Sequence, residues 1–169
     1  MRMSACPKRV ALCLLAMLCA VVAYAQDDTL RPALEARYAA MQAAVGAKDQ
    51  HAISSLVAPD FVSVDVSGHA ENASQMIKDV VDLPADPNQT SKTTLLDIKT
   101  DANRVFVNQR YDMKTKKDAP DGATHEVELT TLSSDTWLNA KGIWLLQRTE
   151  TKQTDYSVDG KLVVHKVRK

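Results

Sequence analysis

Hydrophobic residues in the first half of the chain recur at helical spacing, which predicts three helices. The first is capped near Asp27–Thr29 and ends at Gly46, with its apolar stripe at Leu30, Leu34, Tyr38, Met41 and Val45. Asp49 caps a second, shorter helix, which Pro59 closes and which carries Ile53, Leu56 and Val57. A third is expected over Asn72–Leu83, with the inward side chains Met76, Ile77, Val80 and Val81.

The hydrophobic period changes to two after the loop at Pro84–Asn88, which predicts strands. One earlier strand is expected at Phe61–Val66, and the later ones at Thr93–Thr100, Val105–Thr115, His125–Leu138 and Ile143–Thr154. Asp159-Gly160 predicts a type I′ hairpin between Tyr156–Val158 and Lys161–Val167. Helices followed by an antiparallel meander indicate one α+β domain.

The N-terminus has the pattern of a secretion signal. Arg2, Lys8 and Arg9 precede an apolar run over Val10–Val22, and Ala23-Tyr24-Ala25 is an A-x-A cleavage site. The run is too short for a permanent membrane anchor. We therefore expect residues 1–25 to be removed and residues 26–169 to form a single periplasmic or secreted domain.

The charge and the cysteine content of the chain exclude several classes of function for the mature domain. The chain has 21 basic and 21 acidic residues, and three basic ones lie in the signal, so residues 26–169 carry a net charge of −3. This charge argues against binding to nucleic acid, or to membrane after cleavage. All three cysteines, Cys6, Cys13 and Cys19, lie in the signal, which excludes disulfides and a cysteine nucleophile from the mature domain. The four histidines are scattered, so we expect no metal and no other cofactor.

Two short motifs carry a resemblance to a known family. The stretch Ala58–Gly68, preceded by Lys48-Asp49, and the pair Asp135-Thr136-Trp137, followed by Gly142–Leu146, are similar to the opening and ending of the DUF4440/SnoaL-like group. This group belongs to the nuclear-transport-factor-2-like (NTF2-like) superfamily. The resemblance covers Leu30 to Thr154. It implies three N-terminal helices on a curved antiparallel sheet, a cone with a pocket at its open end, and a homodimer. The C-terminal hairpin is an addition to this core.

A more distant resemblance to ketosteroid isomerase supplies candidate catalytic residues. It implies that Asp65 is a general base and that Tyr38 and a protonated Asp135 hold an enolate oxygen. Each residue also has a structural interpretation. Tyr38 lies on the apolar stripe of its helix, Asp65 can accept bonds from the turn at Gly68, and Asp135 can make a structural hydrogen bond. Asp135 shares a strand face with apolar residues, so its carboxyl must be partnered or neutral.

Three functions are compatible with these features. The first is an exported protein that binds a small-molecule ligand in a pocket lined by Phe61, Tyr111, Leu129 and Trp137. The second is a proton-transfer enzyme, isomerase-like or dehydratase-like, with Asp65 as base. The third is a dimeric interaction module whose C-terminal hairpin extends the sheet.

Overall fold

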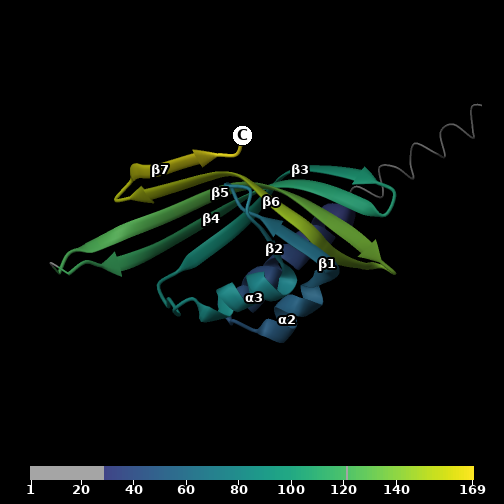
Figure 1. The fold of residues 1–169 in the computed structure, drawn as a ribbon, viewed down its shortest axis with the longest axis horizontal. Coiled ribbons are helices and arrows are strands. Elements are labelled where there is room, and N and C mark those ends of the chain that lie inside the picture. The colour runs from purple at the N-terminus through teal and green to yellow at the C-terminus, as the bar shows by residue number, and fades with distance from the viewer. Residues whose placement is uncertain (1–28, 121) are drawn as a thin grey trace, which may run out of the picture. The chain divides into compact units, whose positions relative to one another are not determined.

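The computed structural model describes residues 29–120 and 122–169 and divides the chain into two units. The described part of the first unit, residues 29–36, is helical, with an ion pair between Arg31 and Glu35. The second unit, residues 37–169, contains the sheet (Figure 1). The predicted secretion signal lies outside the described residues. Among those residues, no helix is both long and apolar enough to cross a bilayer.

Within the described residues the three predicted helices are present, although Val57, which was expected in the second helix, lies in a strand. Residues 29–46 are helical, and α2 (Gln50–Leu56) and α3 (Ala73–Asp82) follow. The Asp49 side chain accepts a hydrogen bond from the Ala52 amide and caps α2. Asn72 and Gln75 form a capping box at the start of α3, in which each side chain accepts from the other residue's amide.

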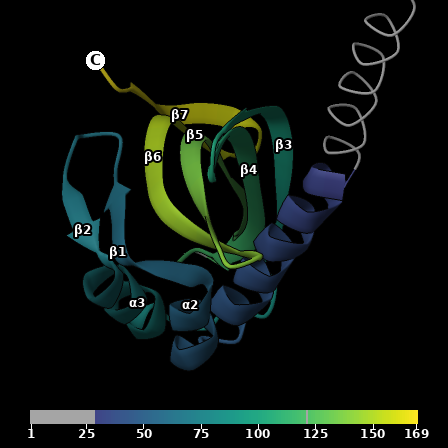
Figure 2. The same cartoon turned by 90° about the vertical axis from the view of Figure 1, so that its right-hand side faces the viewer.

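Seven strands form one curved sheet (Figure 2). Their bounds are β1 Val57–Val64, β2 Ala70–Asn72, β3 Thr90–Asp101, β4 Arg104–Asp118, β5 Thr124–Ala140, β6 Ile143–Val158 and β7 Lys161–Val167. The order is β2-β1-β6-β5-β4-β3, and β7 also pairs with β6. The predicted meander is therefore confirmed from β3 to β7.

The sheet is mixed, which corrects the expected antiparallel arrangement. β1 runs parallel to β6. The chain leaves β1 through β2 and α3, continues through β3, β4 and β5, and then returns beside β1 as β6. β1 also begins at Val57, before Pro59, and ends at Val64. Pro59 lies where the register between β1 and β6 shifts, a position that tolerates a residue without an amide N–H.

Two further details differ from the prediction. The short strand β2 occupies part of a segment that was expected to be a loop, since three residues are too few to show a period. Val81 was expected to point inward but is 36% exposed. Ile77 is buried on α3 and Met76 and Val80 are partly buried, so Val81 lies at the edge of this stripe.

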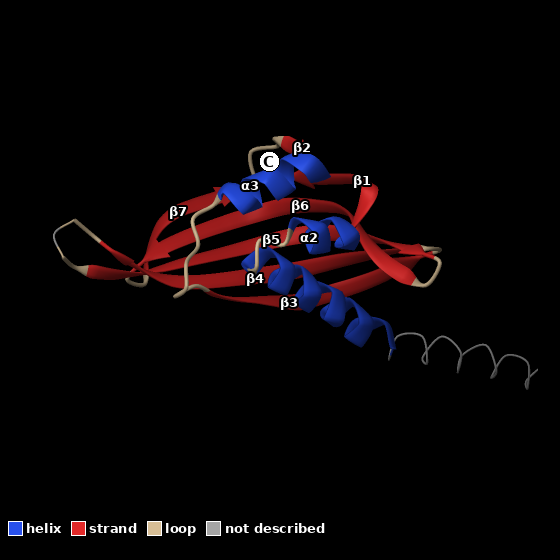
Figure 3. Cartoon of the chain, turned by 90° about the horizontal axis from the view of Figure 1, so that it is seen from below, coloured by secondary structure: helices blue, strands red, loops and turns tan. Residues whose placement is uncertain are grey.

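Residues 37–46 of the first helix, α2 and α3 lie across one face of the sheet, which we call the inner face (Figure 3). A cluster of apolar residues joins the helices: Ala44, Ile53, Leu56 and Ile77 are buried, with Met41 packed against them. The inner face contributes further buried apolar side chains, among them Leu95, Val105, Val107, Trp137 and Leu146.

The C-terminal hairpin forms as predicted, although its first strand is the continuation of β6. Asp159 and Gly160 connect β6 to β7, both with positive φ, as a type I′ turn requires. The Asp159 carboxylate accepts from the Glu126 amide and contacts the His125 ring, which fastens the turn to β5. Leu162, Val163 and Val167 of β7 are exposed.

Candidate functional site

Three side chains meet where the first helix crosses the inner face. The Tyr38 hydroxyl donates to Asp135 Oδ2 over 2.6 Å, and Trp137 Nε1 donates to the Tyr38 hydroxyl over 3.0 Å. The Tyr38 and Trp137 rings meet edge to face, with centroids 5.0 Å apart. Asp135 and Trp137 lie two positions apart on β5 and therefore point to the same face.

Two more donors complete the environment of Asp135. The Thr149 hydroxyl, on β6, donates to Asp135 Oδ1 over 2.6 Å, and the Gln109 side chain, on β4, also hydrogen-bonds to this carboxyl. We call Tyr38, Gln109, Asp135, Trp137 and Thr149 the buried polar cluster. Its members come from one helix and three adjacent strands.

Burial controls the proton affinity of the cluster. Asp135 is only 3% exposed, and desolvation raises its pKa to about 6 against the opposing effect of its three donors. Burial, reinforced by the Asp135 charge, also raises the pKa of Tyr38 above its ordinary value. Tyr38 is therefore a neutral donor, and Asp135 changes protonation state near neutral pH. The sequence-based expectation that Asp135 must be partnered or neutral is confirmed.

Asp65 stands apart from this cluster, in the turn after β1. Its Oδ1 accepts from the Ser67 amide, the Ser67 hydroxyl and the His69 amide, and the residue is exposed. The Ser67 hydroxyl bond and the turn amides lower the pKa of Asp65. Since β6 separates β1 from β5, the end of β1 is two strand spacings, about 10 Å, from Asp135. The structure brings Tyr38 and Asp135 together and leaves Asp65 bonded to its own turn.

The four predicted ligand-lining residues differ in accessibility. Phe61 is 2% exposed and Trp137 is fully buried, with its indole N–H bonded to Tyr38. Tyr111 and Leu129 are half-buried. Both lie on the inner face, beyond the buried polar cluster. Tyr111 is two positions from Gln109 on β4 and Leu129 is six positions from Asp135 on β5, and an even spacing along a strand puts two side chains on the same face.

The character of the inner face changes at Asp135. On one side the buried side chains are apolar: Val105, Val107, Trp137 and Leu146. On the other side the rows continue mainly with polar or half-buried side chains: Gln109, Tyr111, Thr131, Ser133 and Thr151. Leu95, the register partner of Gln109, and Val127 are the buried apolar residues in this part of the face. Gln109 Oε1 is buried without a hydrogen-bond partner within the part of the chain that the structure describes. The inner face therefore becomes mixed in polarity at the buried polar cluster.

Comparison with known proteins identifies this arrangement. A candidate scytalone dehydratase from Novosphingobium aromaticivorans superposes with a TM-score of 0.65 at 11% identity, covering 84% of this chain and 93% of that one. An NTF2-like protein of unknown function from Shewanella oneidensis superposes with a TM-score of 0.57 at 16% identity. The match covers 73% of this chain and 98% of that one. The chain has the NTF2-like fold. A hexachlorocyclohexane dehydrochlorinase, LinA-type3, from Novosphingobium barchaimii superposes with a TM-score of 0.54 at 13% identity. The match covers 81% of this chain and 88% of that one.

No protein-family model matches the sequence, and no curated protein matches it either. At these identities the structural likeness shows the NTF2-like fold alone, since one fold serves unrelated reactions. The function of this chain must therefore be argued from its own side chains.

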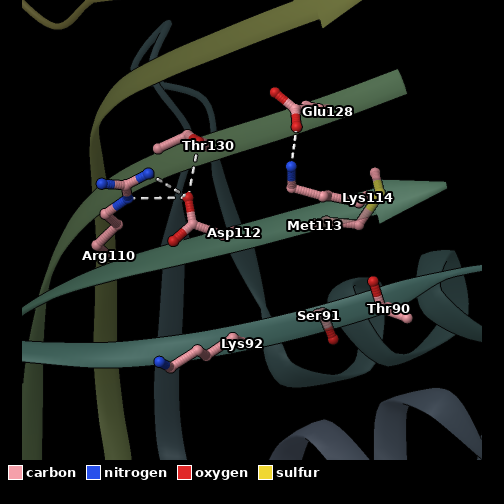
Figure 4. Close-up of a pocket in the computed structure, with 9 residues that line it drawn as sticks. All are labelled: Thr90, Ser91, Lys92, Arg110, Asp112, Met113, Lys114, Glu128 and Thr130. Carbon is pink, nitrogen blue, oxygen red and sulfur yellow. Dashed lines mark hydrogen bonds and ion pairs between the residues drawn. The ribbon is translucent and has the colours of Figure 1, made fainter. Parts of the chain in front are cut away.

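A second candidate region lies on the opposite, outer face of the NTF2-like sheet (Figure 4). It is a hollow of about 460 Å³, lined by Thr90, Ser91, Lys92, Arg110, Asp112, Met113, Lys114, Glu128 and Thr130. Lys92, Asp112 and Thr130 are register partners across β3, β4 and β5, so they form one row on this face. Tyr111 alternates with its two neighbours on β4 and belongs to the inner face, and Met113 and its register partner Ser91 share the alternation of Tyr111.

The charges in this outer-face hollow largely compensate one another. Arg110 Nε and Nη2 both contact Asp112 Oδ1 at 2.8 Å, the Thr130 hydroxyl donates to the same oxygen, and Lys114 pairs with Glu128 (Figure 4). Sequence reasoning missed the hollow because it depends on the register of three strands. It read Lys114 only as part of a solvated hairpin end.

Three of the four histidines pair with carboxylates on the surface. His69 lies near Glu71, His125 near Asp159 and His165 near Asp155. Within residues 29–120 and 122–169, no three histidine, cysteine or acidic side chains gather as metal ligands would.

Proposed function

We propose that the protein binds a small, partly apolar molecule on the inner face of the sheet, beside the buried polar cluster. The observation that carries the proposal is the unpaired, buried Gln109 Oε1 at the point where the inner face becomes mixed in polarity. A buried amide oxygen without a donor costs free energy, and a ligand hydroxyl or amide N–H would remove that cost. The half-buried Tyr111 and Leu129 would supply apolar contact.

Proteins that share the NTF2-like fold support a small-molecule ligand. Two of them are named as a candidate dehydratase and a dehydrochlorinase, so the fold holds small molecules in other proteins. The outer-face hollow is less suited to a partly apolar ligand. Met113 is the only apolar residue among those that line it, and its two carboxylates already have partners.

Proton-transfer catalysis is a second candidate because Tyr38 and Asp135 meet as they would in an oxyanion hole. In this structure, however, Tyr38 donates to Asp135, so the two groups satisfy each other. Asp65 is a weakened base, because its hydrogen bonds lower its pKa. Binding therefore agrees better with the geometry than proton abstraction by Asp65.

Titration with 2-naphthol tests the proposal, since it has an apolar body and one hydroxyl donor. We expect saturable one-to-one binding by isothermal titration calorimetry. Gln109→Met should weaken it about fivefold to tenfold, the effect of one neutral hydrogen bond. Lys114→Met, a change of similar size in the outer-face hollow, should leave the affinity unchanged.

Two results would contradict this proposal. One is the absence of saturable binding by the folded protein. The other is loss of affinity in Lys114→Met but not in Gln109→Met, which would place the ligand on the outer face. Because Gln109 also donates to Asp135, circular dichroism of Gln109→Met must first show a native spectrum.

We further propose that the protein is exported, on the strength of the basic, apolar and A-x-A segments in residues 1–25. Expression in a bacterial host should give a periplasmic or secreted product whose N-terminal residue is Gln26, as read by intact mass. Ala25→Lys should block this cleavage. Recovery of the unaltered chain starting at Met1 from the cytoplasm would contradict export.

A further inference from the structure

Arg37, the residue before Tyr38, has an unusual environment. The side chain as a whole is half-buried, but its Nε and Nη2 are buried and have no hydrogen-bond partner among the described residues. A guanidinium cannot lose its proton at any physiological pH. Two donors of a permanent cation are thus withdrawn from water with nothing to receive them, which costs free energy in the unliganded protein.

The identity of the two atoms indicates the ligand. Nε–H and one Nη2–H point to the same side of a guanidinium and form a fork that donates two hydrogen bonds to a carboxylate. The protein uses this same pair of atoms elsewhere, where Arg110 Nε and Nη2 both contact Asp112. Arg37 has the same pair of donors as Arg110, but among the described residues no carboxylate is bonded to them. Desolvation lowers the pKa of Arg37.

Helical spacing places Arg37 on the side of its helix that packs against α2 and α3. Met41 and Ala44 follow it by four and seven positions, so the three share one side of the helix, and Met41 and Ala44 pack in the cluster with α2 and α3. Gln42, on another side, bonds to Ser91 of β3. Tyr38, which the Asp135 bond fixes over β5, lies between these two sides.

We propose that Arg37 binds the carboxylate of a small organic acid through Nε and Nη2, next to the Tyr38–Asp135 pair. The inference rests on the proposed function and adds a substrate class to it: the ligand is an anion.

Three probes that share one ring system test the charge requirement: 2-naphthoate, its neutral amide 2-naphthamide, and 2-naphthol. We expect Arg37→Met to weaken 2-naphthoate binding at least tenfold and to leave 2-naphthamide and 2-naphthol within twofold. Arg31→Met is the matched control, because Arg31 lies on the same helix but its side chain is 46% exposed and pairs with Glu35. It should change none of the three affinities.

A second measurement separates binding from folding. Without ligand, Arg37→Met should raise the melting temperature, because it removes buried donors that have no partner. With saturating 2-naphthoate, the wild-type protein should gain more in melting temperature than the variant does. A lower melting temperature for unliganded Arg37→Met would show that the guanidinium already has a stabilising partner and would overturn the inference.

The failures of the two proposals are distinguishable. If 2-naphthol or 2-naphthamide binds but 2-naphthoate does not, or if Arg37→Met weakens acid and amide equally, the role of Arg37 is wrong and the proposed binding function stands. If none of the three probes binds to the folded protein, both proposals fail.

Discussion

Replacing Asp135 with leucine is expected to lower the free energy of unfolding by about 2–4 kcal/mol at neutral pH. The substitution removes the acceptor for Tyr38, Thr149 and Gln109, and each buried donor left unpaired costs about 1–3 kcal/mol. Two effects oppose this loss. The variant no longer buries a carboxylate, and leucine adds apolar contact. We expect the three lost bonds to outweigh these gains because all three donors are held by fixed backbone elements.

Urea unfolding monitored by the fluorescence of the two tryptophans, Trp137 and Trp144, measures this loss. Two variants that each remove one donor are the controls: Tyr38→Phe and Thr149→Val should each cost about 1 kcal/mol. The double variant Asp135→Leu/Tyr38→Phe should be less destabilised than the sum of its parts, because Tyr38→Phe removes one of the unpaired donors. A loss below about 1 kcal/mol for Asp135→Leu would mean that water reaches the cluster and replaces the missing acceptor.

Local sequence signals predicted the elements well where a side chain acts on its own backbone. Asp49 caps its helix as expected, and Asp159-Gly160 forms the predicted turn. Each signal acts within four residues, so it does not depend on the rest of the fold. The period of two in residues 125–138 likewise placed Asp135 on the same face as Trp137.

The errors arise where tertiary contacts decide. Val57 was assigned to a helix but begins β1, because it pairs with Leu146 of β6, a strand 89 residues further along the chain. The parallel pairing of β1 and β6 has no local signal at all. Val81 has the composition of a core residue, yet the contacts of α3 with its neighbours leave it at the edge of the buried stripe.

The site was predictable in part. Helical spacing placed Tyr38 on a buried stripe, and strand alternation placed Asp135 in a buried row, but their contact spans 97 positions and followed only from the family resemblance. Asp65 makes the turn bonds that its sequence context suggested. Arg37 and Gln109 were missed, because an unpaired buried atom is a property of packing that no residue pattern shows.

The contribution of Asp135 to the stability of the protein is expected to fall as the pH rises from about 4 to about 7, by up to about 3 kcal/mol. Burial raises the pKa of this carboxyl to about 6, whereas in the unfolded chain it titrates near its ordinary value of about 3.9. Below both values the carboxyl is protonated in either state and its full contribution is present. Between them the folded protein retains a proton that the unfolded chain releases, so each rise in pH favours unfolding.

Asp135→Asn isolates this contribution because asparagine cannot titrate. The exposed carboxylates whose hydrogen bonds lower their pKa, such as Asp65 and Asp155, act in the opposite sense and lose their stabilisation as the pH falls. These carboxylates are present in both the wild type and Asp135→Asn, so their effects cancel when the free energies of unfolding of the two proteins are subtracted. The free energy of unfolding of the wild type minus that of Asp135→Asn should therefore decrease from about pH 4 to about pH 7 and then level off. Parallel pH profiles for the two proteins would show that Asp135 keeps an ordinary pKa in the fold, which requires solvent at a carboxyl that the structure buries at 3% exposure.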